Sequence, residues 1–232
     1  MILNKAIIIF SRMNSSRLPG KALMKLAGKT LLEHVITRAK LCQTQARIIV
    51  ATSNETSDDL LAQLCKNLNV DYFRGPLNNL VLRTHQTMEH FKIDSMARVC
   101  GDRIFLDYKS IDCAFHFIDR YKYDVVTNKN LSPNPGLTTE VLTKSTIEKL
   151  LQSSLSKEEQ EHLTQFIYKK KENWKIKNLE TIPNVRPNIR LVIDDEQDFF
   201  NTEKTIKSLQ QKLGENYHQI ATYADISSSY AE

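Results

Sequence analysis

Short apolar runs alternate with amphipathic segments along the first half of the chain, and this alternation restricts the fold more than any other feature. Uniformly apolar, β-branched runs are typical of strands covered on both faces. Apolar residues at intervals of three and four are typical of helices. The expected strands are residues 6–10, 47–51, 70–73 and 97–100, and the expected helices are residues 31–41, 57–68, 77–91 and 110–121. The alternation predicts a doubly wound α/β fold with a mostly parallel sheet.

From residue 123 onward the elements follow one another less regularly. We expect strands at 124–128, 139–143 and 189–193, an alternating segment at 174–182, and helices at 145–152, 156–169 and 195–213. No internal repeat or linker is visible, so we expect one domain over residues 1–232. Its parts are a nucleotide-binding half (1–122), a substrate-facing insertion (123–188), and a returning strand and helix (189–213). The stretch after Gly214 has no motif, and we expect it to be loosely held.

Composition excludes several classes of protein. The chain has only 6 Gly, and the nearest two, Gly20 and Gly28, are too far apart for a G-x-G-x-x-G or Walker A loop. The 4 Cys form no C-x-x-C pair, which favours reduced thiols in a cytoplasmic protein. A net charge of +5, without a dense basic block, favours a small anionic substrate over nucleic acid. No run has membrane-spanning length and no secretory leader is visible, so we expect no membrane partner.

The loop directly after the first strand, residues 11–21, is rich in cations and hydroxyls. Its sequence is SRMNSSRLPGK, with Arg12, Arg17 and Lys21 as the cations and Ser11 as the first of three serines. In open α/β sheets ligands bind beyond the carboxyl ends of the strands. Guanidinium groups match phosphate oxygens, and lysine and serine add further donors. A solvated basic loop is the alternative, but the position after a buried strand favours phosphate binding.

Two carboxylates follow other expected strands. Asp102 comes after Gly101 at the end of 97–100, and Asp194 comes directly after 189–193. Two separate carboxylates that converge on one cation form the usual Mg²⁺ site beside nucleotide phosphates. Each also has a structural interpretation, because Gly-Asp occurs in ordinary turns and acidic residues at 194–196 could cap a helix. We expect Asp195 or Glu196 to act as the cap and Asp194 to face the metal.

The 11–21 loop resembles the nucleotide loop of bacterial sugar cytidylyltransferases of the spore-coat polysaccharide biosynthesis type, which are related to CMP-KDO and CMP-acylneuraminate synthetases. The resemblance continues in order through much of the chain, at residues 31–36, 49–52, 73–75, 80–83, 101–102, 136–137, 140–141, 161–168 and 193–199. It implies a Rossmann-like nucleotide-diphospho-sugar transferase fold, three-layer α/β/α, and a homodimer. The insertion 123–188 would then serve sugar binding and dimerisation.

The resemblance also implies roles for individual residues. The implied catalytic residues are Lys21, Arg12, Asp102 and Asp194, of which Asp102 and Asp194 would bind Mg²⁺. The implied nucleotide-binding residues are Ser11, Arg12, Met13, Arg17, Lys21, Ala51, Thr52, Arg74 and Arg83. The implied sugar-binding residues are Arg103, Glu140, Glu161, His162 and Arg190, some of which could instead complete a dimer. For His162, a packed and hydrogen-bonded helix residue is an equal alternative.

One departure from the family pattern lies beside the expected metal ligand. Where the family has Gly-Asp-Cys-Pro-Leu, this chain has Gly-Asp-Arg-Ile-Phe at 101–105. Arg103 could pair with Asp102 and weaken metal binding, or it could reach a substrate anion.

The resemblance implies transfer of CMP from CTP to a KDO-like or nonulosonic sugar acid, with release of pyrophosphate, for surface polysaccharide synthesis. Two alternatives stay open. One is a catalytically silent nucleotide-binding homologue, and the other is nucleotidyl transfer to a phosphorylated sugar.

Overall fold

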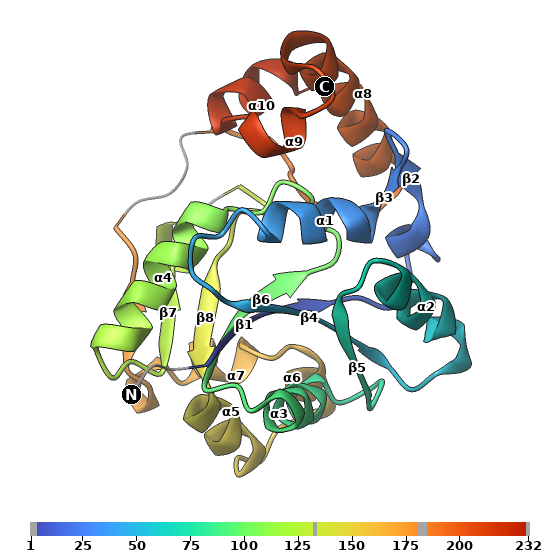
Figure 1. Ribbon diagram of the computed structural model, residues 1–232. Helices are drawn as coiled ribbons and strands as arrows, with labels where there is room; N and C mark the ends of the chain where they lie inside the picture. Colours follow the sequence, from blue (N-terminus) through green and yellow to red (C-terminus); the bar gives the residue numbers. More distant parts are fainter. Residues whose placement is uncertain (1–3, 132–133, 181–184, 231–232) are drawn as a thin grey trace.

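Seven strands form one mixed sheet in the computed structural model, which describes residues 4–131, 134–180 and 185–230. The sheet order is β5-β4-β1-β6-β8-β7-β9 (Figure 1). The strands are β1 (Lys5–Phe10), β4 (Arg47–Ser53), β5 (Asp71–Gly75), β6 (Ser95–Cys100), β7 (Val125–Thr127), β8 (Glu140–Thr143) and β9 (Ile176–Asn178). Of these seven strands β8 alone runs antiparallel to its neighbours, so the predicted mostly parallel sheet is confirmed.

Helices cover both faces of the sheet and make the three predicted layers (Figure 1). The longer helices of the first 151 residues are α1 (Leu31–Ala39), α2 (Asp59–Asn67), α3 (Leu80–Phe91), α4 (Tyr108–Arg120) and α5 (Lys144–Leu151). Ile7 and Ile9 of β1 pack in the core with α1, α2 and α4. Ile8 and Phe10 point to the opposite face and pack with α3 and α5. Successive residues of a strand face opposite layers, so a strand that is covered on both faces needs an apolar residue at each position.

Short elements complete the loops at the carboxyl end of the sheet and around it. They are η1 (Lys21–Leu23), the hairpin β2 (Lys25–Leu26) and β3 (Lys29–Thr30), η2 (Thr56–Asp58), η3 (Lys129–Leu131) and η4 (Lys171–Asn173). The predicted helix over 156–169 is wrong as one continuous element. It is divided into α6 (Lys157–Glu161) and α7 (Gln165–Lys169), because His162 leaves helical geometry at φ −108° and ψ 80°. The break presents Glu161 and His162 at the end of a helix.

The predicted late strand at 189–193 is also wrong. Ile189, Leu191 and Ile193 are buried, which explains the apolar pattern, but the segment pairs with loops and not with a strand. The Leu191 amide donates to the Pro135 carbonyl at 2.7 Å, and the Ile193 amide donates to the Asp102 carbonyl at 3.1 Å. The second bond fixes the chain just before Asp194 to the loop after β6.

The C-terminal stretch is more ordered than the sequence predicts. After α8 (Glu196–Leu213), whose N-cap is Asp195 as expected, come α9 (Tyr217–Ile220) and α10 (Tyr223–Ser229). Tyr217 and Ile226 are buried in the core that includes α1 and α4. The expectation of a loosely held tail is therefore wrong up to residue 230. No helix within the described residues is both long and apolar enough to cross a membrane.

Candidate active site

A cleft of about 330 Å³ opens where β1 and β6 end, between the 11–21 loop and residues 100–102. A second cavity of about 160 Å³ adjoins it and shares Phe10, Ser11, Arg12 and His162 as lining residues. The two loops approach so closely that a Cβ on Gly101 would lie 2.8 Å from the Ser11 hydroxyl, which only glycine avoids. The cleft therefore lies at the edge of the sheet where the strand order predicts a ligand.

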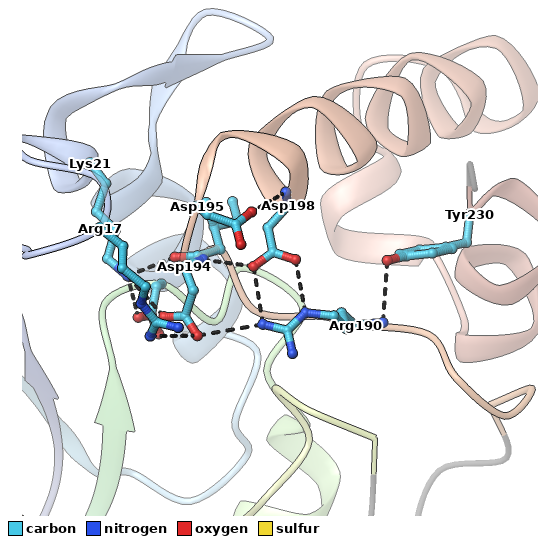
Figure 2. Close-up of polar contacts among 9 residues, drawn as sticks. Arg17, Lys21, Arg190, Asp194, Asp195, Asp198 and Tyr230 are labelled. Atoms are coloured by element: carbon cyan, nitrogen blue, oxygen red, sulfur yellow. Dashed lines mark hydrogen bonds and ion pairs between the residues drawn. The ribbon is translucent and has the colours of Figure 1, made fainter.

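Lys21 and Asp102 line this cleft, and Lys21 pairs with both Asp102 and Asp194; we call these three residues the lysine cluster. Figure 2 shows Lys21 beside Asp194. The Lys21 ammonium donates to Asp102 Oδ2 at 2.7 Å and to the Ile193 carbonyl at 2.6 Å, and it lies 3.4 Å from Asp194 Oδ1. Their side chains are 14%, 16% and 22% exposed, respectively. The structure thus brings the two predicted metal ligands to the same cation, although 92 residues separate them in the sequence.

One oxygen of the lysine cluster has no partner. Asp102 Oδ1 is buried and accepts no hydrogen bond within the described part of the chain. A buried, unpartnered carboxylate oxygen is costly, since it has lost water without gaining a donor. Carboxylate and carbonyl oxygens are the donors that hard divalent cations such as Mg²⁺ prefer. The residues present therefore fit a divalent cation held by Asp102 and Asp194.

Asp194 is oriented by further cations at its second oxygen. Asp194 Oδ2 lies 3.1 Å from Arg17 and 3.5 Å from Arg190 (Figure 2). Arg190 itself makes a bidentate pair with Asp198, at 2.9 and 3.1 Å, and Asp198 also accepts from the Asp194 amide at 3.0 Å. Burial favours a raised pKa for Asp198, but the bonds from Arg190 and the backbone outweigh it and lower that pKa. The first turn of α8 thus holds Asp194 toward Lys21.

The adjoining cavity carries a second charged wall. Arg12 of the 11–21 loop pairs with Glu161, the last residue of α6, at 3.1 Å, and both residues line this cavity. Arg83 is 4% exposed and lines the same cavity. Burial, together with the positive charge of Arg12, lowers the pKa of Arg83 to about 10. An anion placed between these two arginines would relieve that repulsion.

Asp58 is a buried residue that the sequence analysis missed. Its carboxylate accepts from the Met13 amide at 2.7 Å, the Thr52 hydroxyl at 2.8 Å and the Ser53 amide at 2.9 Å, as well as from the Ser53 hydroxyl. These bonds tie the cationic loop to the end of β4. The signal was weak, because an aspartate before a helix is usually a cap.

A second charged group joins β6 to β8 and α7: Arg98, Glu140 and Tyr168, which we call the Arg98 cluster. Arg98 donates to Glu140 Oε2 at 2.7 Å, and the Tyr168 hydroxyl donates to Oε1 at 2.8 Å. Glu140 is 2% exposed, so it is a buried anchor and not an open contact surface. Burial favours a raised pKa for Glu140, but Arg98 and Tyr168 outweigh it and lower that pKa. The sequence signal was an arginine inside an apolar strand, which needs a buried partner.

Ala51, Thr52, Arg74 and Arg103 do not line the open cleft, whereas His162 does. Ala51 and Thr52 are fully buried in β4. Arg74 donates to the Ser53 and Glu55 carbonyls and pairs with Asp59, on the wall of a separate cavity beside β5. Arg103 donates to the Thr138 carbonyl at 2.7 Å, and no ion pair joins it to Asp102 within the described residues. The cation on Asp102 is Lys21. His162 is exposed and lines both cavities.

Comparison with known proteins identifies the family. Residues 6–224 match the family model described as cytidylyltransferase. The spore coat polysaccharide biosynthesis protein SpsF of Bacillus subtilis is 30% identical over 216 residues, which are 90% of this chain and 87% of SpsF. An uncharacterized protein of Methanocaldococcus jannaschii is 32% identical over 193 residues, which are 83% of this chain and 79% of that protein.

Solved structures agree with the sequence matches. A cytidylyltransferase from Leptospira borgpetersenii has a TM-score of 0.85 at 27% identity, covering 97% of this chain and 92% of the other. The CMP:2-keto-3-deoxy-manno-octonic acid synthetase complexed with CTP has a TM-score of 0.68 at 16% identity, covering 90% and 100%, and shares the fold. The predicted nucleotidyltransferase-type α/β fold is thereby confirmed. From the sequence and structural matches together, the chain belongs to the cytidylyltransferase family.

Proposed function

We propose that this chain is a Mg²⁺-dependent nucleotidyltransferase that transfers CMP from CTP to a hydroxyl of a sugar acid and releases pyrophosphate. The lysine cluster carries the proposal, because two carboxylates with one unpartnered oxygen lie beside a loop of phosphate-binding cations. The sugar-acid acceptor, KDO-like or nonulosonic, is supported by the likeness to the synthetase complexed with CTP. A role in surface polysaccharide synthesis is supported by the likeness to SpsF.

The proposal includes the organisation expected from the sequence. Residues 1–232 would act as one nucleotidyltransferase domain, working in the cytoplasm as a homodimer. The nucleotide-binding half would supply the CTP site, and the insertion 123–188 would supply acceptor and dimer contacts. Glu161 and His162 are the candidates for acceptor contacts, since both line the adjoining cavity with Arg12, and His162 also lines the cleft.

The reaction needs alignment and charge neutralisation and no covalent intermediate on the protein. The acceptor oxygen forms a bond to the α-phosphorus, the bond from that phosphorus to the pyrophosphate oxygen breaks, and the hydroxyl proton is released. Arg12 and Arg17 bind phosphate oxygens with their guanidinium groups, and Lys21 adds a positive charge that stabilises the leaving pyrophosphate. A divalent cation on Asp102 and Asp194, when bound, supplies further neutralisation of the phosphate oxygens.

Pyrophosphate release tests the proposal. The protein is incubated with CTP and Mg²⁺ against a panel of KDO-like and nonulosonic sugar acids, with sugar phosphates as a second panel. We expect release that depends on one of the sugar acids. Release only with a sugar phosphate would show the phosphorylated-acceptor alternative. CTP binding without release across both panels would show the silent homologue and overturn the proposed enzyme.

Matched variants locate the chemistry. Asp102→Asn and Asp194→Asn should each lower turnover by about 100-fold or more, since each removes a carboxylate that would hold the divalent cation at the phosphates. Asp195→Asn is the control, because asparagine also caps a helix and the change removes one negative charge beside Asp194. Near-normal turnover in either of the first two variants would overturn that residue's assignment as a metal ligand.

A further inference from the structure

The Lys21 ammonium lies inside the same set of oxygens that would hold a divalent cation. It has three donors, and its three oxygen neighbours are Asp102 Oδ2, the Ile193 carbonyl and Asp194 Oδ1, at 2.7, 2.6 and 3.4 Å. The side chain is only 14% exposed, so the ammonium is withdrawn from water into this set of oxygens (Figure 2). Lysine therefore neutralises the two metal ligands from within the protein.

A lysine and a divalent ion cannot share this place. Both would draw on the same two carboxylates, and like charges a few ångströms apart repel strongly in a partly buried site. Arg17 and Arg190 add to the positive charge around Asp194 Oδ2. Since Arg190 also pairs with Asp198, three cationic side chains already balance three carboxylates, and an added divalent ion meets little uncompensated negative charge. Asp102 Oδ1 is an acceptor that none of these cations uses within the described residues.

A bound triphosphate supplies negative charge that can draw the Lys21 ammonium away from the two carboxylates. It brings several negative charges to the loop that carries Lys21, and the long lysine side chain can turn toward them without backbone movement. Lys21 begins η1 directly after Gly20 and lines the cleft together with Arg12 and Arg17. Once the ammonium follows the phosphates, Asp102 and Asp194 are left facing each other with their charge uncompensated.

We infer, on the basis of the proposed function, that Lys21 competes with the metal ion for the two carboxylates and that the nucleotide releases Lys21 from them. Without nucleotide, Lys21 occupies the carboxylates and the divalent ion binds weakly. With nucleotide, Lys21 moves to the phosphates and the ion takes its place. Linkage makes the effect reciprocal, so the metal also strengthens nucleotide binding.

Mn²⁺ is the probe for the test, observed by the enhancement of water-proton relaxation when the ion binds to a slowly tumbling protein. Titrations are run with and without CTP and without acceptor, on the wild type, Lys21→Met and the surface control Lys25→Met. Without CTP, we expect Lys21→Met to bind Mn²⁺ at least tenfold more tightly than the wild type and Lys25→Met. Adding Asp102→Asn to Lys21→Met should abolish that gain.

Two contrary outcomes are distinct. Equal Mn²⁺ affinity of wild type and Lys21→Met without CTP overturns the competition while leaving the proposed function standing. Absence of enhancement in the wild type even with CTP, where pyrophosphate is also not released, overturns the proposed function itself. Lys21→Gln, which keeps an N–H donor for the Ile193 carbonyl, replaces Lys21→Met if the latter folds poorly, and the same tenfold gain is expected from it.

Discussion

The lysine cluster and the Arg98 cluster both pair cationic side chains with carboxylates, but their acceptor oxygens are satisfied to different degrees. Both Glu140 oxygens have a donor, and Glu140 is 2% exposed. In the lysine cluster, Asp102 Oδ1 has none within the described residues, and the carboxylates are 16% and 22% exposed. A carboxylate whose two oxygens both have donors holds elements together, whereas one with an unpartnered oxygen can exchange partners. We therefore expect the Arg98 cluster to determine stability and the lysine cluster to determine activity.

The largest effect on stability is expected from Glu140→Gln. The change leaves Arg98 as an uncompensated buried charge, which typically costs about 3–5 kcal/mol of unfolding free energy. Urea denaturation measures it. The double variant Arg98→Met with Glu140→Leu should recover much of the loss, because an apolar pair of similar volume needs no buried counter-charge. A loss of less than about 1 kcal/mol of unfolding free energy in Glu140→Gln would mean that the Arg98 cluster contributes no more to stability than the lysine cluster does.

A smaller loss, about 1–3 kcal/mol, is expected from Asp58→Asn at neutral pH, since buried donors on the 11–21 loop and β4 lose a charged acceptor. Burial favours a raised pKa for Asp58, but the bonds from Ser53, Met13 and Thr52 outweigh it and lower that pKa. A lowered folded-state pKa means that the ionised carboxylate stabilises the fold above its ordinary pKa of about 3.9.

The lowered pKa of Asp58 determines how the effect of Asp58→Asn on stability depends on pH. The stability difference between wild type and variant should be constant from neutral pH down to about pH 5, then shrink as pH falls through the folded-state pKa of Asp58. Thermal denaturation across this range measures it. A difference that grows on acidification would show that Asp58 is protonated in the folded protein, and the loop would then need another anchor.

Asp102→Asn should lower activity while leaving stability nearly unchanged. We expect the unfolding free energy to change by no more than about 1 kcal/mol, because Lys21 keeps Asp194 and the Ile193 carbonyl as partners. Turnover should nevertheless be lost. Urea denaturation and pyrophosphate release on one preparation give both numbers. A stability loss as large as that of Glu140→Gln would remove the distinction between the clusters.

The smallest stability effect is expected from Arg17→Met. Arg17 is 64% exposed, and surface ion pairs of this kind contribute about 0–1 kcal/mol. CTP affinity should fall, and its dependence on salt concentration should weaken, because one phosphate contact is removed. Calorimetric titration at two salt concentrations measures both. Unchanged CTP affinity would take Arg17 out of the phosphate site.

Much of the fold could be predicted from the local order of apolar and polar residues along the chain. The apolar runs within β1 and β4 and the amphipathic α1 were predictable because burial on two faces or on one face determines the pattern of apolar residues in the sequence. The segment 189–193 was predicted wrongly because its apolar residues are buried under loops, and periodicity does not reveal whether a neighbouring strand is present. Asp194 still reaches Asp102, since the Ile193 amide bonds to the Asp102 carbonyl.

The charged residues of the site were predictable only in part. Arg12, Arg17, Lys21 and Asp102 follow strands directly, and strand ends meet at one edge of a parallel sheet. Asp58 was missed because the bond that ties it to the site joins it to the Met13 amide, 45 residues away, although Thr52 and Ser53 are near it in the sequence. Arg98 was missed because its partner Glu140 lies 42 residues away. Such pairings depend on three-dimensional packing that no local pattern encodes.

Calorimetric titration of CTP, with Mg²⁺ and then with EDTA, tests most directly whether the cleft is a metal-assisted nucleotide site. We expect Mg²⁺ to strengthen CTP binding to the wild type at least tenfold, and Asp102→Asn and Asp194→Asn to lose that gain while still folding. CTP affinity that is the same with Mg²⁺ and with EDTA, in a protein that releases no pyrophosphate, would contradict the account and favour a silent nucleotide-binding homologue.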